Sequence, residues 1–229
     1  MTQTSRDISS LSATDRLARF LEWPTVRRGP YGWGRVLAGF ALLVLGCGLV
    51  AVGAGTLLGI GASVEGEPTQ PTSPARGVLQ AGLPIALWGL VVVAVARMVF
   101  RMRVDDLFSH LPGIRWGLLV RAALVALVCP GILFTIMSVV KGRSAQLTTP
   151  ALLGVLAAVI VIPLQSMAEE LIFRGFSMQM VLGKLGTSTA RYWVASLVFG
   201  ILFASIHAAS NLTVWLALMA FALLFSYLV

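Results

Sequence analysis

Long runs without any charged residue divide this chain. The first lies between Arg35 and Glu65, and the last extends from Tyr192 to the C-terminus. A helix needs about 20 consecutive apolar residues to cross the hydrocarbon core of a bilayer, and these runs are long enough. The pattern predicts an all-α, multi-pass transmembrane helical bundle of about six membrane helices, over residues 36–61, 79–99, 117–140, 149–168, 192–208 and 212–229.

The polar segments between these runs predict the domain organisation. Residues 1–34 are polar and of mixed charge, which is typical of a tail outside the membrane. Residues 35–145 then form a set of N-terminal transmembrane helices, and residues 146–229 form a second helical part that contains the candidate chemistry.

Composition and charge place the chain in the membrane. Hydrophobic residues make up 58% of it and charged residues 11%, against about 25% charged residues in an ordinary soluble domain. Such a composition excludes a soluble globular fold and a disordered chain. The net charge of +8 comes mostly from segments that flank apolar runs, which favours contact with the lipid bilayer. No nucleic-acid-binding motif is present, so no nucleic-acid partner is predicted.

The distribution of Lys and Arg predicts the orientation. The tail is rich in arginine, the loop after the first run carries only Arg76, and the next loop is again rich in arginine. Under the positive-inside rule this alternation predicts an integral cell-membrane protein with a cytoplasmic N-terminus. It also predicts that the segment from Glu169 to Arg191 lies on the cytoplasmic side.

Two adjacent carboxylates, Glu169 and Glu170, are the first candidate for chemistry. Ionisable groups at membrane depth are costly, so they are functional candidates by default. Glu170 precedes Arg174 by four residues, the better orientation for a helical ion pair. Glu169 then points about 100° away, and its carboxylate is a candidate general base toward water or a metal ligand. The alternative is that both carboxylates are interfacial anchors that reach out to water.

His207 is the second candidate. It follows an apolar run, and Phe203, His207 and Asn211 share one helical face if the helix continues through them. A lone histidine there is commonly a satisfied core residue. Paired with Glu169 across a polar cavity, it provides the chemistry of an activated water or a divalent metal. We expect the apolar helix to run on past Glu169 through Phe176, which brings the carboxylate deeper.

At these residues the chain resembles the CAAX protease and bacteriocin-processing family (CPBP, also called Abi), a family of intramembrane peptidases. The resemblance rests on Glu169-Glu170-x-x-x-Arg174, read as Glu-Glu-Leu-Ile-Phe-Arg-Gly, and on Phe203-x-x-x-His207, and it covers about residues 150–229. It implies a helical membrane bundle with a polar cavity open to the cytoplasm. Glu169, Glu170, Arg174 and His207 are the implied catalytic residues, with Phe203 and Asn211 in support.

The resemblance leaves the metal open. It implies either a metal, often zinc, held by Glu169 and His207, or a metal-free water activated by the same two residues. A further family motif, a histidine followed four residues later by Asn or Asp, does not follow His207. Because the chain stops at Val229 inside an apolar run, we expect the catalytic core at 146–229 to be incomplete at its C-terminus. With few nitrogen donors, we expect weak zinc binding and low peptidase activity from these 229 residues.

Three function classes remain at this stage. The first is an intramembrane endopeptidase that cuts a peptide or protein substrate near the cytoplasmic face of the membrane. The second is a non-catalytic membrane scaffold or bacteriocin-immunity protein, and the third is a small proton-coupled carrier. A Glu169→Gln variant separates them, since it abolishes peptidase activity, leaves a scaffold working and uncouples a carrier.

Overall fold

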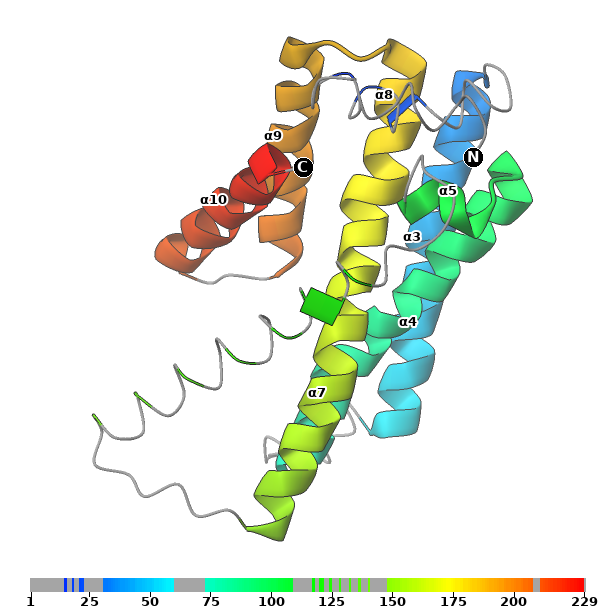
Figure 1. Ribbon diagram of the computed structural model, residues 1–229. Coiled ribbons are helices and arrows are strands. Elements are labelled where there is room, and N and C mark those ends of the chain that lie inside the picture. Colours follow the sequence, from blue (N-terminus) through cyan, green and yellow to red (C-terminus); the bar gives the residue numbers. More distant parts are fainter. Residues whose placement is uncertain are drawn as a thin grey trace. The chain divides into compact units, whose positions relative to one another are not determined.

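The fold is described from a computed structural model. It describes residues 31–59, 73–108, 148–207 and 211–228, together with isolated positions between 15 and 22 and between 117 and 140. All regular structure in these residues is helical, as predicted. The described elements are α3 (Trp33–Leu58), α4 (Pro74–Phe100), α5 (Val104–Phe108), α7 (Thr149–Glu170), the π-helix η1 (Leu171–Ser177), α8 (Met178–Leu185), α9 (Thr189–Ile206) and α10 (Leu212–Leu228) (Figure 1).

Four helical stretches of the described residues are long and apolar enough to cross a membrane: Trp33–Leu58, Pro74–Phe100, Thr149–Leu185 and Thr189–Ile206. A shorter apolar helix covers Leu212–Leu224. The prediction of an all-α, multi-pass membrane protein is therefore confirmed, with four candidate spans where about six were expected. Most of the predicted span at 117–140 lies outside the described residues, although isolated positions such as Leu124 and Val128 are helical.

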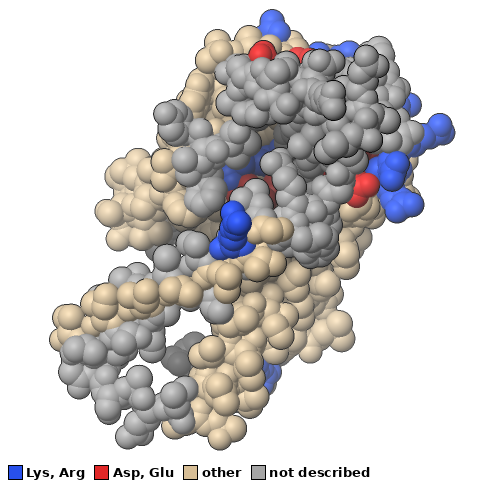
Figure 2. Space-filling view, viewed as in Figure 1, with Lys and Arg blue, Asp and Glu red and all other residues tan. Residues whose placement is uncertain are grey.

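Large apolar side chains cover much of the outer surface of these helices. Leu57 is 88% exposed and Leu49 is 75% exposed, and most described atoms visible in Figure 2 belong to uncharged residues. In water such a surface would aggregate, whereas lipid chains solvate it. The exposed face of each candidate span is therefore the surface that fits a bilayer.

The chain forms two compact units. One comprises residues 1–41, 94–112 and 170–229, and we call it unit 1. The other comprises residues 42–93 and 113–169, and we call it unit 2.

In unit 2, α3 and α4 approach closely at Gly46. A Cβ atom added there would lie 2.5 Å from Cγ1 of Val91. Next to this contact, the Trp88 indole N–H donates to the carbonyl oxygen of Cys47 at 3.0 Å. Between membrane helices, packing and hydrogen bonds hold two helices together, because lipid is as apolar as the side chains themselves.

Replacing Gly46 by alanine is expected to destabilise the protein by about 1–3 kcal/mol, because the new methyl group overlaps Val91 and forces α3 away from α4. Gly48 is the matched control, since a Cβ there meets nothing within 4 Å. Gly48→Ala should leave stability unchanged or raise it slightly through helix propensity. Unfolding in detergent, followed by helical circular dichroism, measures both; equal effects of the two variants would contradict the prediction.

In unit 1, α9 begins at a polar cap and packs on α8. The Ser188 hydroxyl accepts from the backbone N–H of Arg191, and Gly186 ends α8 in the left-handed region, with φ of 78°. Leu21 is buried with Met178, Leu182, Tyr192 and Ala195. This cluster joins the N-terminal tail to α8 and α9, and α10 lies along α9 (Figure 1).

Candidate functional site

The two carboxylates lie where one long helix changes its hydrogen-bonding pattern. The helix runs from Thr149 to Leu185, so the prediction that it continues through Phe176 is confirmed. Directly after Glu170 it becomes the π-helix η1, and the Met178 N–H donates to the carbonyl oxygen of Phe173, five residues earlier. π-Helical turns are rare and are frequently found at functional sites, where the extra residue redirects side chains.

Glu170 and Arg174 form the ion pair that their spacing predicts. The Arg174 guanidinium also donates to the backbone carbonyl of Ala222 in α10, at 3.0 Å. Arg174 is largely buried and Glu170 is half exposed. The arginine therefore does two things: it neutralises one carboxylate and ties η1 to α10.

Glu169 belongs to unit 2 and is partly buried. The Gln165 side-chain amide donates to its Oε1 atom at 3.1 Å, one helical turn earlier. Gly82 of α4 leaves the room that Gln165 occupies, because a Cβ there would lie 2.9 Å from Gln165 Oε1. The amide donor fixes the orientation of the carboxylate, and it leaves the carboxylate able to accept further hydrogen bonds.

His207 ends α9 in unit 1. Its Nδ1 atom lies 2.8 Å from the carbonyl oxygen of Phe203. Because a carbonyl only accepts, Nδ1 carries the proton in this contact, and Nε2 is the nitrogen that can accept one. The imidazole also packs on the Phe203 ring, with centroids 4.4 Å apart, and Phe203 packs edge-on against Phe173 at 5.5 Å. A line of aromatic contacts therefore joins η1 to His207.

Asn211 does not lie on a helical face shared with Phe203 and His207, because it is outside α9. α9 ends at Ile206, and Asn211 precedes α10, where its side-chain oxygen accepts from the backbone N–H of Thr213 at 2.8 Å. This is a capping interaction of the kind that starts helices. A supporting role of Asn211 at the site stays a prediction.

The structure thus brings together Glu170 with Arg174, and Phe203 with His207. Glu169 lies in unit 2 and His207 in unit 1, so their pairing across a polar cavity stays a prediction. Gln165 and Gly82 were not predicted from the sequence. A polar Gln165 in an otherwise apolar run, four residues before Glu169, is the signal that could have found the first of them.

Further contacts in unit 1 hold η1 and the start of α8. Gln179, which is fully buried, donates through its amide to the carbonyl oxygen of Asp106 at 2.9 Å. Tyr31 donates to the carbonyl oxygen of Gln179 at 3.2 Å. Gly175 lies close to the α5 backbone, since a Cβ there would be 3.1 Å from the Leu107 carbonyl oxygen. The segment after the carboxylates is therefore clamped from α5 and from the tail.

The described donors do not fit a zinc site. A catalytic zinc takes three protein ligands and leaves one position open. Among the residues that the structure describes, no three His, Cys, Asp or Glu side chains come together. Glu169 and His207 would offer one carboxylate and one imidazole, which is one protein ligand fewer than a catalytic zinc takes.

Comparison with known proteins gives one match. Residues 148–229 match the profile of the family described as Rce1-like, type II CAAX prenyl endopeptidase. This stretch contains α7, η1, α8, α9 and α10, and with them all the candidate site residues. The chain therefore contains an Rce1-like domain, which confirms the resemblance seen in the sequence. No curated protein and no solved structure matched the chain.

Proposed function

We propose, from the Rce1-like domain at residues 148–229, that the protein is an intramembrane endopeptidase of the CAAX-protease type. The observation that carries the proposal is the π-helix directly after Glu169-Glu170, within the matched domain, with Arg174 bonded to Glu170 and to α10. Carboxylates that served only as interfacial anchors would not need a π-helix or a bond from Arg174 to a second helix. All five helical elements of the domain lie in apolar segments, four of them in two candidate membrane spans and α10 in the shorter apolar helix, as a membrane peptidase requires.

In this mechanism Glu169 is the general base. Its carboxylate takes a proton from water, and the resulting hydroxide attacks the carbonyl carbon of the scissile peptide bond. His207 stabilises the oxygen of the tetrahedral intermediate through Nε2, which becomes an N–H donor once it has taken up a proton. When the C–N bond breaks, the protonated Glu169 returns its proton to the leaving amine, so that the carboxylate is regenerated.

Glu170 and Arg174 have a positioning role: they hold the helix that carries the proposed base. Because their ion pair is formed within one helical turn and Arg174 also bonds the α10 backbone, they hold η1 at one register. Gln165 holds the Glu169 carboxylate in a similar way. Precise placement of a base is worth orders of magnitude in rate, and a shift of about 1 Å costs about 10²-fold.

The substrate and the side of cleavage are part of the proposal. The family name specifies a prenyl endopeptidase of CAAX sequences, so a prenylated peptide or protein at the membrane is the substrate class. Such a substrate stays at the bilayer through its hydrocarbon chain. The alternation of basic loops supports a cytoplasmic N-terminus and cleavage near the cytoplasmic face.

The test uses the 229-residue chain reconstituted in liposomes with a farnesylated peptide that ends in a CAAX sequence. Incubation in water enriched in ¹⁸O should give a shortened peptide that carries one ¹⁸O atom in its new carboxylate. The non-prenylated peptide should be cut more slowly. Because low activity is expected from these 229 residues, the incubation is long and liposomes with the Glu169→Gln protein give the background. Labelled product no higher than this background would contradict the proposal, and a proton flux without any cleavage would favour the carrier class.

A further inference from the structure

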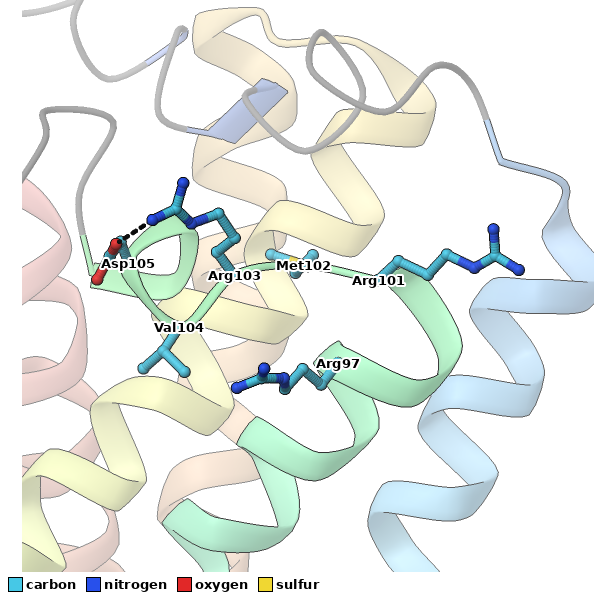
Figure 3. Close-up of a pocket in the computed structure, with 6 residues that line it drawn as sticks. All are labelled: Arg97, Arg101, Met102, Arg103, Val104 and Asp105. Atoms are coloured by element: carbon cyan, nitrogen blue, oxygen red, sulfur yellow. Dashed lines mark ion pairs between the residues drawn. The ribbon is translucent and has the colours of Figure 1, made fainter.

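A cavity of about 530 Å³ opens in unit 1 where α4 ends. It is lined by Arg97, Arg101, Met102, Arg103, Val104 and Asp105 (Figure 3). Pro74–Phe100 is a candidate membrane span, so this cavity lies at the end of a span, where lipid headgroups meet the protein. It involves none of the residues proposed for peptide hydrolysis.

The lining is strongly basic. Three of the six residues are arginines, and one is an aspartate. Arg103 and Asp105 form an ion pair of 3.5 Å with both side chains more than half exposed. An exposed pair of this kind contributes little and leaves most guanidinium donors available. Among the described residues, Arg97 and Arg101 make no ion pair at all.

The backbone turn sets the direction of the arginines. Arg101 has φ of 55°, in the left-handed region that favours glycine, and the Met102 N–H reaches back to the Ala96 carbonyl oxygen at 3.0 Å. Arg101 extends away from the other two arginines, whereas Arg103 extends above the loop toward Asp105 and Arg97 lies below the loop (Figure 3). Arg97 and Arg103 therefore reach the cavity from the two sides of the loop.

The turn is also fixed in place. Met102 is almost fully buried, and the buried Asp106 carboxylate accepts from the backbone N–H of Arg103 at 2.8 Å. The Asp106 carboxylate thus holds the backbone of the turn at Arg103, beside the cavity. On a fixed backbone no backbone conformational entropy is lost when the arginines bind a ligand, and their planar donors suit phosphate oxygens.

We propose that this cavity binds the phosphate group of an anionic phospholipid through Arg97 and Arg103. The chemistry is that of a phosphodiester held by two guanidinium groups. The source is a membrane lipid, because Met98, on the last turn of α4, is 80% exposed and offers an apolar surface for acyl chains next to the arginines. Basic pockets at the ends of membrane helices bind anionic headgroups in this way.

The test compares two double variants of the full chain that remove the same charge. Arg97→Gln with Arg103→Gln removes the proposed ligands. Arg35→Gln with Arg121→Gln is the control, because both side chains are exposed and neither lines the cavity. Native mass spectrometry in detergent measures the binding of phosphatidylglycerol and of phosphatidylcholine to each protein.

The first double variant should bind phosphatidylglycerol about tenfold more weakly than the unmodified chain, while the control stays within about twofold. Binding of phosphatidylcholine should be the same in all three. Equal losses in both double variants would mean diffuse surface charge, and no loss in either would mean no site; both overturn the proposal. If millimolar inorganic phosphate displaces phosphatidylglycerol, the ligand is a soluble phosphate, which overturns the lipid assignment.

Discussion

Replacing Glu169 by glutamine is expected to lower kcat/KM for peptide hydrolysis by about 10²–10⁴-fold, the contribution typical of a general base. Glutamine has nearly the shape of glutamate but cannot take a proton from water. It still accepts a hydrogen bond from Gln165, so the local helix should remain as it is. Release of the labelled product from the farnesylated peptide measures the change, and helical circular dichroism checks the fold.

Ser166→Ala is the matched control for this variant, because Ser166 lies on the same helix, three residues earlier, and is exposed. It should keep the activity of the unmodified chain within about twofold, in line with the small effects of surface substitutions. A Glu169→Gln protein that keeps more than a tenth of the activity would show that another group activates the water. A control that loses as much activity would show that the segment is sensitive for structural reasons.

Replacing Phe176 by alanine is expected to cost about 3–5 kcal/mol in the free energy of unfolding. Phe176 lies in η1, is 0% exposed, and packs edge-on against Phe40 at 5.8 Å and Phe100 at 5.5 Å between ring centroids. In a membrane the gain from removing apolar surface from water is largely absent. The loss therefore comes from the contacts that the ring makes and from the cavity that it leaves.

Leu57→Ala is the control for the loss of a large apolar side chain, because Leu57 is 88% exposed. Its removal should change stability by less than about 1 kcal/mol, since lipid or detergent replaces the missing contacts. Unfolding in detergent by increasing denaturant gives both values. Equal effects of the two substitutions would mean that the packing around η1 does not stabilise the protein.

The helical spans could be predicted from the sequence because membrane helices must be apolar over their whole length. Charges therefore bound them, and the expected 36–61 and 79–99 differ from Trp33–Leu58 and Pro74–Phe100 by a few residues. The differences arise at the ends, where caps and turns decide and hydropathy does not. Ser188, for example, begins α9 before the first apolar residue.

Only those contacts of the site that join residues close in the sequence could be predicted. The pair of Glu170 and Arg174 follows from helical spacing, and it is present. The π-helix has no residue signature of its own, so the sequence predicts only that a helix continues past Glu169. The space that Gly82 leaves for Gln165 depends on how α4 and α7 pack, which no spacing along the chain reveals.

The length of the helix that carries Glu169 makes the depth of this carboxylate in the membrane depend on bilayer thickness. From Thr149 to Ala168 the helix has no charged residue and rises roughly 30 Å, at about 1.5 Å per residue, which matches the hydrocarbon core of an average bilayer. A bilayer a few ångströms thicker draws the Glu169 carboxylate into hydrocarbon, and a thinner one leaves it in the wet headgroup region. The acyl-chain length of the host membrane would then set how far the Glu169 carboxylate lies from water, without any ligand or modification.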